Sequence, residues 1–237
     1  MKLLDAIFGA RAVELDAATE AAIARWRALS PADLRAPLPT QRWRVVDVET
    51  TGLDMRRDRL LAIGAVAMEG NEIRLQDSFE IVLKQAKPST TGNILIHRIG
   101  GSEQCDGIEP RAALLAFLAY AEKFPCVAFH AQFDETMLKR AFDENLGLAF
   151  SPLFIDLALL APVLCSDAPP GLRSLDDWVD YFSIAIPARH RAVADAFGTA
   201  QLFQVLLRRA AKQNIGSAEA LFKIAQDQRW LARIRPH

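Results

Sequence analysis

The sequence predicts an α/β fold in which a mixed β-sheet is flanked by helices. Three strand-like segments, at residues 43–49, 60–68 and 72–83, follow one another in a pattern that favours antiparallel pairing. After residue 110 the pattern changes to helices that alternate with short apolar strands. This order of elements is typical of a layered fold whose sheet combines antiparallel and parallel pairs. A chain of 237 residues, 51% of them hydrophobic, can fill one large core.

The first 40 residues are rich in alanine and are predicted to be helical. Apolar side chains recur there at helical spacing, at Leu15, Ala18, Ala22, Trp26 and Leu29. Ser30 followed by Pro31 predicts the N-cap and first position of a short second helix.

The remaining elements follow from local patterns along the chain. The second and third strands are separated by Glu69-Gly70-Asn71, a typical hairpin turn. Residues 84–93 have the composition of a loop. The later elements are a helix at 110–123, a strand at 126–130, a helix to about residue 145, and helices near 155–164, 173–182, 191–213 and 217–232.

These patterns divide the chain into three parts. We expect a helical N-terminal extension at 1–40, a central domain at 41–212 and a basic C-terminal helix at 213–237. The N-terminal extension is either a helical cap on the sheet or a docking element for a partner protein or a second copy. The three parts together are predicted to form one domain with extensions.

The charge of the whole chain is nearly balanced, with 28 Lys and Arg against 29 Asp and Glu. This balance excludes a histone-like binder of nucleic acid, but not an enzyme that holds one strand end. Residues 208–237 alone carry seven cations and two acids, a net charge of +5. These cations either follow a nucleic acid strand or form the solvated face of a helix.

The cysteines and the apolar segments indicate the compartment. Cys105, Cys126 and Cys165 are too few and too widely spaced for a disulfide framework or a zinc site. They are expected to be free thiols in a reducing environment. Asp5 interrupts the apolar N-terminus before a signal peptide could form, and no apolar run has the length of a membrane span. We therefore expect a soluble, cytoplasmic protein with no membrane partner.

Two acids interrupt the first strand, in the segment "VVDVETTGL" at residues 45–53. Asp47 and Glu49 are two residues apart, so their side chains point to the same face of the sheet, roughly 6–7 Å apart. A salt bridge or an edge position for the strand could explain them. However, the strand is too apolar for an edge, and no Lys or Arg of the strand core could pair with both acids. Because buried like charges are costly, a divalent cation, Mg²⁺ or Mn²⁺, explains the pair better.

A two-metal site needs more ligands, and the chain supplies three candidates. Asp134 follows a short strand and lies in the first turn of a helix, where acids also occur for dipole reasons. Asp195 lies near the start of a helix that is otherwise apolar. His190 precedes Asp195 by five residues and cannot share its helix face, so we place it on the turn or cap before the helix. A surface histidine without a role is the alternative for His190.

In combination these motifs resemble the DEDDh, or DnaQ-like, family of 3′–5′ exonucleases, and within it the proofreading ε subunit of DNA polymerase III. The matching motifs are Asp-x-Glu-Thr-Thr-Gly-Leu at 47–53, Phe-Asp at 133–134 and His-x4-Asp at 190–195, in the family's order. The segments "FIDLALLA" and "LRSLDDWVDYFSI" also resemble the family's sequence between its second and third motifs. The resemblance covers residues 41–212 and implies a ribonuclease H-like fold.

The resemblance implies a role for each matching residue. Asp47, Glu49 and Asp195 would ligate two divalent cations, Mg²⁺ or Mn²⁺, with Asp47 bridging both ions. Asp134 would hold the second cation through water, and His190 would be the general base. Glu49 would also receive the 3′-hydroxyl of the substrate.

The resemblance also implies a substrate-binding set. The Thr50 and Thr51 backbone and Gly52 would lie along the terminal nucleotide, and Leu53 would wedge against its base. Phe133 and His97 would also face substrate, although a core position is the alternative for His97. The sequence departs from the family at His130, where Asn is common, at Phe129, where His is common, and at Arg98, where Gly is usual.

The implied activity is release of nucleotides from 3′ ends, of a proofreading or repair type. The "TTG" motif and the length of the chain favour DNA. RNA is the alternative, because local geometry decides whether a 2′-hydroxyl is recognised. A non-catalytic binding module on the same fold would lack an acid or the histidine, and all five are present. The expected partners are DNA 3′ ends and a polymerase or other protein reached through the terminal extensions.

Overall fold

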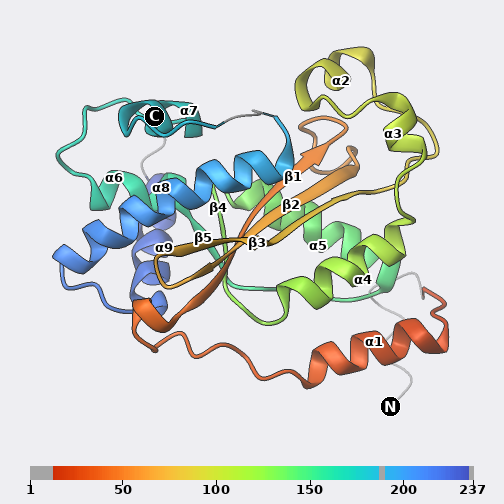
Figure 1. Ribbon diagram of the computed structural model, residues 1–237, viewed down its shortest axis with the longest axis horizontal. Helices are drawn as coiled ribbons and strands as arrows, with labels where there is room; N and C mark the ends of the chain where they lie inside the picture. The colour runs from red at the N-terminus through yellow and green to blue at the C-terminus, as the bar shows by residue number, and fades with distance from the viewer. Residues whose placement is uncertain (1–12, 187–189, 235–237) are drawn as a thin grey trace.

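The computed structural model describes residues 13–186 and 190–234 and is built around one five-stranded sheet (Figure 1). The strand order is β3-β2-β1-β4-β5. The strands are β1 (Arg42–Thr50), β2 (Leu60–Glu69), β3 (Glu72–Val82), β4 (Cys126–Ala128) and β5 (Phe154–Asp156). The strands β1, β2 and β3 pair antiparallel, whereas β4 and β5 run parallel to β1. The mixed sheet predicted from the sequence is confirmed.

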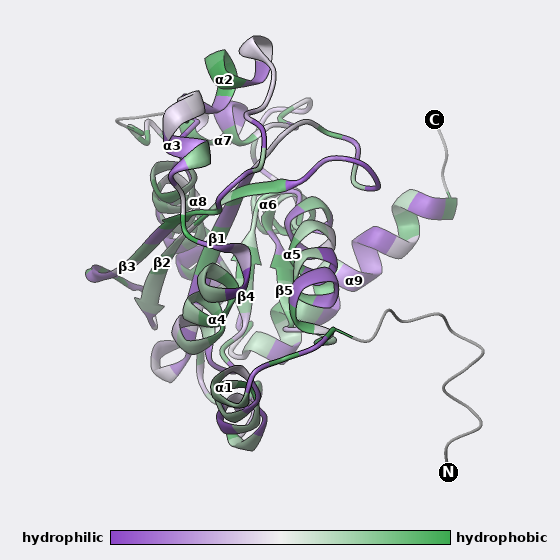
Figure 2. Ribbon diagram, turned by 90° about the vertical axis from the view of Figure 1, so that its right-hand side faces the viewer, coloured by the Kyte–Doolittle hydropathy of each residue, from purple (hydrophilic) through white to green (hydrophobic). Residues whose placement is uncertain are grey.

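Helices cover both faces of this sheet, as Figures 1 and 2 show from two directions. The long helix α8 (Ala192–Lys212) packs across one face, against β1, β2 and β3. The helices α4 (Pro110–Ala121) and α5 (Gln132–Leu146) cover the other face. Each face has its own core, with Trp43 and Phe203 on the α8 side and Phe117 and Phe142 on the other.

The alternation of side chains along β1 decides which face receives the acids. Trp43 and Val45 belong to the core on the α8 side, whereas Val46 and Val48 belong to the core under α4 and α5. Because successive strand side chains point to opposite faces, Asp47 and Glu49 lie on the α8 side. Both acids therefore face the helix that carries Asp195.

The short strand β4 leaves the end of β1 open on one side. The parallel pairing between β1 and β4 covers Arg44 and Val45, whereas β2 follows β1 through to Thr50. The backbone of the last residues of β1 is consequently available to side chains from α5. The strand end that carries Asp47 and Glu49 is thus bordered by α5 and α8.

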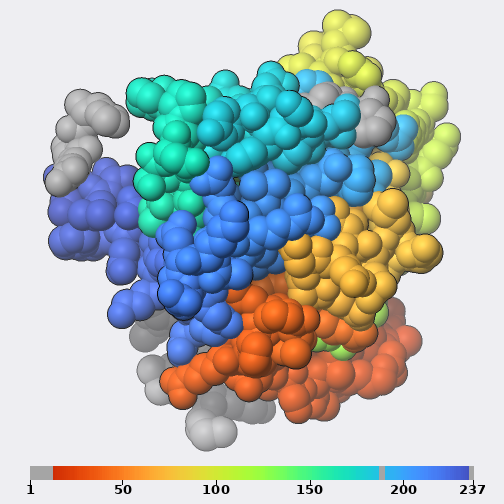
Figure 3. Space-filling model, turned by 60° about the vertical axis from the view of Figure 1, so that its left-hand side comes forward, coloured from red at the N-terminus to blue at the C-terminus, as the bar shows by residue number. Residues whose placement is uncertain are grey.

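A glycine of β2 allows α8 to approach the sheet closely. Gly64 lies opposite Asp47 in the β1–β2 register. A Cβ atom built on Gly64 would lie 2.1 Å from the backbone of Ala192 and Val193, at the start of α8. Any larger residue would push this end of the helix away from the sheet. In Figure 3 the helix α8 (blue) lies between the α6–α7 segment and β3.

The smaller elements surround this core. They are α1 (Ala17–Ala28), a 3₁₀ turn (Leu38–Thr40), α2 (Thr91–His97), α3 (Gly101–Cys105), α6 (Leu157–Leu164), α7 (Leu175–Tyr181) and α9 (Ala218–Ile234). The hairpin turn at Gly70 and Asn71 and the long helices are where the sequence predicts them.

Three predicted features differ from the structure. The helix expected after Ser30 is absent and is replaced by a turn, in which the Asp33 carboxylate accepts the Arg35 N–H at 2.9 Å, and by the 3₁₀ segment. Phe154–Asp156 forms β5 rather than the start of a helix, since pairing with β4 captures this short apolar run. The predicted loop ends at Thr90, whose hydroxyl caps the unpredicted helix α2.

The helices α1 and α9 both pack against other elements of the fold. In α1, Ile23 is buried, and the Trp26 indole N–H donates to the Glu122 carbonyl oxygen at 2.7 Å. In α9, Leu221 and Ala225 are buried, and the helix contacts α6 and β5. The expectation for residues 1–12 lies outside the described residues.

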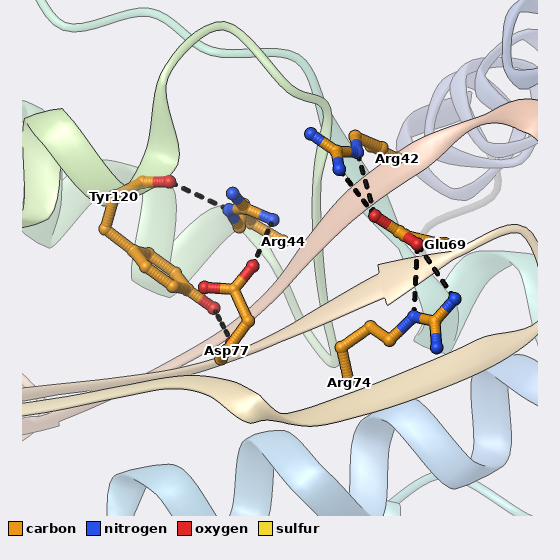
Figure 4. Close-up of polar contacts among 6 residues, drawn as sticks. All are labelled: Arg42, Arg44, Glu69, Arg74, Asp77 and Tyr120. Atoms are coloured by element: carbon orange, nitrogen blue, oxygen red, sulfur yellow. Dashed lines mark hydrogen bonds and ion pairs between the residues drawn. The ribbon is translucent and has the colours of Figure 1, made fainter.

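A network of arginines holds the other end of β1 (Figure 4). The buried Arg44 donates from Nε to the Tyr120 carbonyl oxygen at 2.9 Å and lies 3.6 Å from the Asp77 carboxylate. Arg42 pairs with Glu69 at 2.6 Å. Three residues of strand, about 10 Å, separate Arg44 from Asp47. Arg42 and Arg44 are therefore engaged in structural contacts at the start of β1, away from Asp47 and Glu49.

Within the described ranges, no helix combines the length and the apolar character needed to cross a membrane.

We predict that Gly64→Ala lowers the free energy of unfolding by about 1–3 kcal/mol, because the new methyl group overlaps the backbone of α8. Urea denaturation followed by circular dichroism would measure the change. The matched control is Gly216→Ala, where the added Cβ meets nothing within 4 Å. Equal stability of the two variants would show that α8 does not depend on Gly64.

Candidate active site

Three carboxylates from two elements meet at the end of β1. Asp47 and Glu49 come from β1, and Asp195 comes from the first turn of α8. One oxygen from each of the three lies within 4.8 Å of the others. Asp195 is buried, and the two acids of β1 are half-buried. The structure thus brings together three of the four predicted acidic ligands.

The start of α8 positions both Asp195 and His190. Asp195 lies in the first turn, where the helix dipole stabilises a negative charge. Its Oδ2 accepts a hydrogen bond from the His190 backbone N–H at 2.9 Å. His190 lies on the turn before α8, as the spacing predicts, with a φ of 64° and an exposed side chain. This hydrogen bond holds the left-handed turn at His190 against the first turn of α8.

Asp134 lies apart from the three clustered carboxylates and is directed at the backbone of β1. It occupies the first turn of α5, is 5% exposed, and accepts the Val48 N–H through Oδ1 at 3.1 Å. That amide is accessible because β4 does not extend this far along β1. Asp134 therefore closes the open side of the strand end.

Burial raises the pKa of Asp134 from 3.8 to about 8. The hydrogen bonds from backbone amides, including that of Val48, oppose this rise, and the negative charges of Asp156 and Glu49 add to it. In the metal-free protein Asp134 is thus held largely protonated at neutral pH. A cation bound near Glu49 would favour the ionised form of Asp134.

Asp156 is a further buried acid that was not among the predicted site residues. It ends β5 and caps α6 by accepting the Ala158 N–H at 3.1 Å. Burial raises the pKa of this carboxyl as well. The sequence signal was an acid directly after a short apolar segment, the same pattern as Asp47.

Arg229 connects the C-terminal helix to this buried acid. Its Nη2 lies 3.7 Å from Oδ2 of Asp156, and the arginine side chain is 34% exposed. The positive charge lowers the pKa of Asp156, against the effect of burial. At least one cation of the basic C-terminal segment is therefore engaged with the domain rather than free for a nucleic acid strand.

The loop after β1 contains the residues expected to contact a nucleotide. Thr50 is buried and donates from its hydroxyl to the Gly52 carbonyl oxygen at 2.6 Å. The Thr51 N–H donates to the Arg59 carbonyl oxygen at 2.9 Å. Leu53 is 86% exposed, which is unusual for a leucine. The loop thus presents an apolar side chain at its tip.

The structure moves His97 out of the substrate-facing set. Its side chain is 2% exposed, Nδ1 accepts the Ile99 N–H at 3.1 Å, and Nε2 lies 3.1 Å from the Ser89 hydroxyl oxygen. Both ring nitrogens are thus engaged in holding the segment around α2. His97 is an interior histidine, which was the alternative interpretation of the sequence.

Phe133 and His130 border Asp134. Phe133 is half-buried and packs against the core under α5. His130 is exposed and has a φ of 58°. This left-handed conformation is one that Asn and His adopt more readily than most residues. A histidine at this position is therefore compatible with the left-handed turn, although the family resemblance predicts Asn there.

The clustered acids suit a hard divalent cation. Their donors are all carboxylate oxygens, the ligand type preferred by Mg²⁺ and Mn²⁺. Two of the three side chains remain partly exposed, so an ion and a substrate could reach them. Bound cations would neutralise the negative charge that these carboxylates bring together.

Comparison with known proteins identifies a family model and several related proteins. Residues 45–203 match the family model RNase_T, described as Exonuclease. The PolC-type DNA polymerase III of Caldanaerobacter subterraneus subsp. tengcongensis is 28% identical over 184 residues, which cover 78% of this chain and 13% of that protein. The PolC-type DNA polymerase III of Thermotoga maritima is 31% identical over 166 residues, 67% of this chain and 11% of that protein. The chain thus spans only about an eighth of these curated relatives.

Solved structures share the fold at lower identity. Escherichia coli exonuclease I in complex with a dT13 oligonucleotide has a TM-score of 0.62 at 18% identity, covering 73% of this chain and 42% of that chain. Exonuclease X in complex with 5′ overhanging duplex DNA has a TM-score of 0.59 at 20% identity, covering 77% of this chain and 99% of that chain.

We predict that Asp134→Asn stabilises the metal-free protein at neutral pH by roughly 1–3 kcal/mol. The raised pKa makes the folded state bind the proton more tightly than the unfolded state. In the wild-type protein, the contribution of Asp134 to the free energy of unfolding is therefore greatest below pH 4. This contribution is lost as the pH rises toward 8. Asn keeps an oxygen for the Val48 N–H but cannot ionise.

Urea denaturation in EDTA at pH 4 and at pH 7.5 would measure this difference. The advantage of Asp134→Asn over wild type should be small at pH 4 and larger at pH 7.5. A constant advantage at both values would mean that ionisation of Asp134 is not the cause.

Proposed function

This chain belongs to the DnaQ-like 3′–5′ exonuclease family, and from that membership we propose that it removes nucleotides from the 3′ ends of DNA by metal-dependent hydrolysis. The observation that carries the proposal is the cluster of Asp47, Glu49 and Asp195, with oxygens within 4.8 Å of one another. It lies beside an exposed loop and an exposed histidine. A binding module would not need this concentration of like charge.

The acids would hold two divalent cations, Mg²⁺ or Mn²⁺. Asp47, Glu49 and Asp195 would be the direct ligands, and Asp134 would complete the site once it ionises. When bound, such cations favour formation of the attacking hydroxide and stabilise the departing oxygen of the phosphodiester. Glu49 would also accept a hydrogen bond from the 3′-terminal hydroxyl.

His190 would act as the general base. Its side chain is exposed on the turn that Asp195 holds, so it can meet a water molecule beside the scissile phosphate. The imidazole would take the proton as that water attacks, and the leaving oxygen would become the new 3′ end of the strand.

The loop Thr50–Leu53 would receive the terminal nucleotide. Leu53 is 86% exposed and would stack against the base, and the backbone of Thr50, Thr51 and Gly52 would lie along the nucleotide. Phe133 would contribute a partly exposed apolar edge beside Asp134. DNA is favoured as substrate because exonuclease I and exonuclease X were seen with DNA and the curated relatives are DNA polymerases.

The proposal also covers the cellular process in which the reaction takes place. The PolC-type relatives contain the matching region within a much longer polymerase. We place this chain in replication or repair, as a domain at 41–212 with a helical N-terminal extension at 1–40 and a basic C-terminal helix at 213–237. A polymerase or another protein would be reached through these extensions.

Labelled oligonucleotides test the activity. With Mg²⁺, 5′-labelled DNA should give a ladder of shortening products, and 3′-labelled DNA should release labelled mononucleotide at once. Asp47→Asn should abolish both results and also the rise in melting temperature that Mg²⁺ produces in wild type. Faster degradation of matched RNA would overturn the choice of DNA, and internal cuts would overturn exonuclease action.

His190→Ala should lower the single-turnover rate by roughly 10²–10⁴-fold, the usual contribution of a positioned base. Because the His190 side chain is exposed, the variant should keep the stability of wild type. Mg²⁺ should still raise its melting temperature, since the carboxylates remain. An unchanged rate would remove His190 from the mechanism.

A further inference from the structure

The loop between β1 and β2 is organised around the carboxylate of Asp58. Its Oδ1 accepts the Thr51 hydroxyl at 2.8 Å, and its Oδ2 accepts the Asp54 N–H at 2.8 Å. Gly52 lies directly against the carboxylate, since a Cβ on Gly52 would be 2.5 Å from Oδ2. One side chain thus holds the positions on both sides of Leu53.

Arg140 fastens this loop to α5. Its Nη1 donates to the Met55 carbonyl oxygen and its Nη2 to the Asp58 carbonyl oxygen. The side chain is 22% exposed, and its Nε lies 3.3 Å from Glu144, one turn further along the helix. The guanidinium therefore bridges two carbonyls of the loop while the helix holds it in place.

A third contact closes the loop from the other side. The Asn93 side-chain amide of α2 donates to the Thr51 carbonyl oxygen. With its N–H bonded to Arg59, Thr51 has both backbone groups engaged within the protein. The loop is consequently fixed to α5 and α2, and Leu53 projects from it into solvent.

We propose that Arg140 and Asp58 are positioning residues that hold the Thr51–Leu53 loop for the 3′-terminal nucleotide. This inference rests on the proposed function. The same helix carries Asp134 in its first turn, so Arg140 ties the nucleotide-binding loop to the element that borders the carboxylates. The 3′ end and the reacting phosphate are thereby held at a constant separation.

The chemistry of the bridge requires arginine. A planar guanidinium can donate to two carbonyl oxygens at once from a fixed fork, whereas a lysine ammonium is a compact charge on a flexible stem. Loosening the loop removes a contact made to the nucleotide in both the ground state and the transition state. Such a loss raises KM and leaves kcat nearly unchanged.

Arg140→Gln tests the proposal, with Lys139→Gln as the matched control. Lys139 is the neighbouring cation of α5, pairs with Glu135 on its own helix and has no bond to the loop among the described contacts. Both variants lose one positive charge from the same helix. The readouts are kcat and KM on a single-stranded DNA oligonucleotide with Mg²⁺, and hydrogen exchange of the amides at 51–59.

Arg140→Gln should raise KM roughly tenfold with kcat within about threefold of wild type, and speed amide exchange in the loop. Lys139→Gln should change neither. Asp58→Asn should repeat the Arg140→Gln pattern, because its amide cannot accept both hydrogen bonds. If Arg140→Gln does not fold, Arg140→Lys decides, with a smaller rise in KM expected.

Two results would overturn the role. One is an unaltered KM in the folded Arg140 variant, whether or not the loop exchanges faster. The other is an equal rise in KM in Lys139→Gln, which would assign the effect to charge alone. A wild-type protein that cleaves no 3′ end would overturn the proposed function and this role with it, whereas the results above overturn this role alone.

Discussion

The close contact between α8 and Gly64 is the constraint on which the candidate site depends. Three carboxylates from two elements have oxygens within 4.8 Å of one another, so β1 and α8 must be packed closely at this point. The stabilising interaction is the burial of the apolar face of α8, including Leu202, Phe203 and Leu206, on the sheet. The missing side chain at Gly64 lets the first turn of that helix reach the strand end.

Charge is segregated along β1 as a consequence. Arg42 and Arg44, near the start of the strand, are satisfied by Glu69, Asp77 and the Tyr120 carbonyl oxygen. The acids lie at the other end. The cations of β1 therefore stabilise the start of the strand, about 10 Å from Asp47.

Two side chains of α5 hold the segments next to the acids. Asp134 in its first turn binds the β1 backbone, and Arg140 binds the loop after β1. The negative charge of Asp156 helps to raise the pKa of Asp134, and Asp156 is paired with Arg229 of the C-terminal helix. Contacts that hold the site thus extend to α9, a segment whose sequence indicates only a basic amphipathic helix.

The sequence alone determined the mixed sheet, the three-motif order and the shared face of Asp47 and Glu49, because strand and helix periodicities are local properties. Only the tertiary structure decided that His97 is interior, that Asp134 turns to the Val48 amide, and that Arg140 holds a loop more than 80 residues away in the chain. The same packing decided that Phe154–Asp156 is a strand, because β4 pairs with it. Each of these outcomes depends on partners distant in sequence, which a local pattern does not contain.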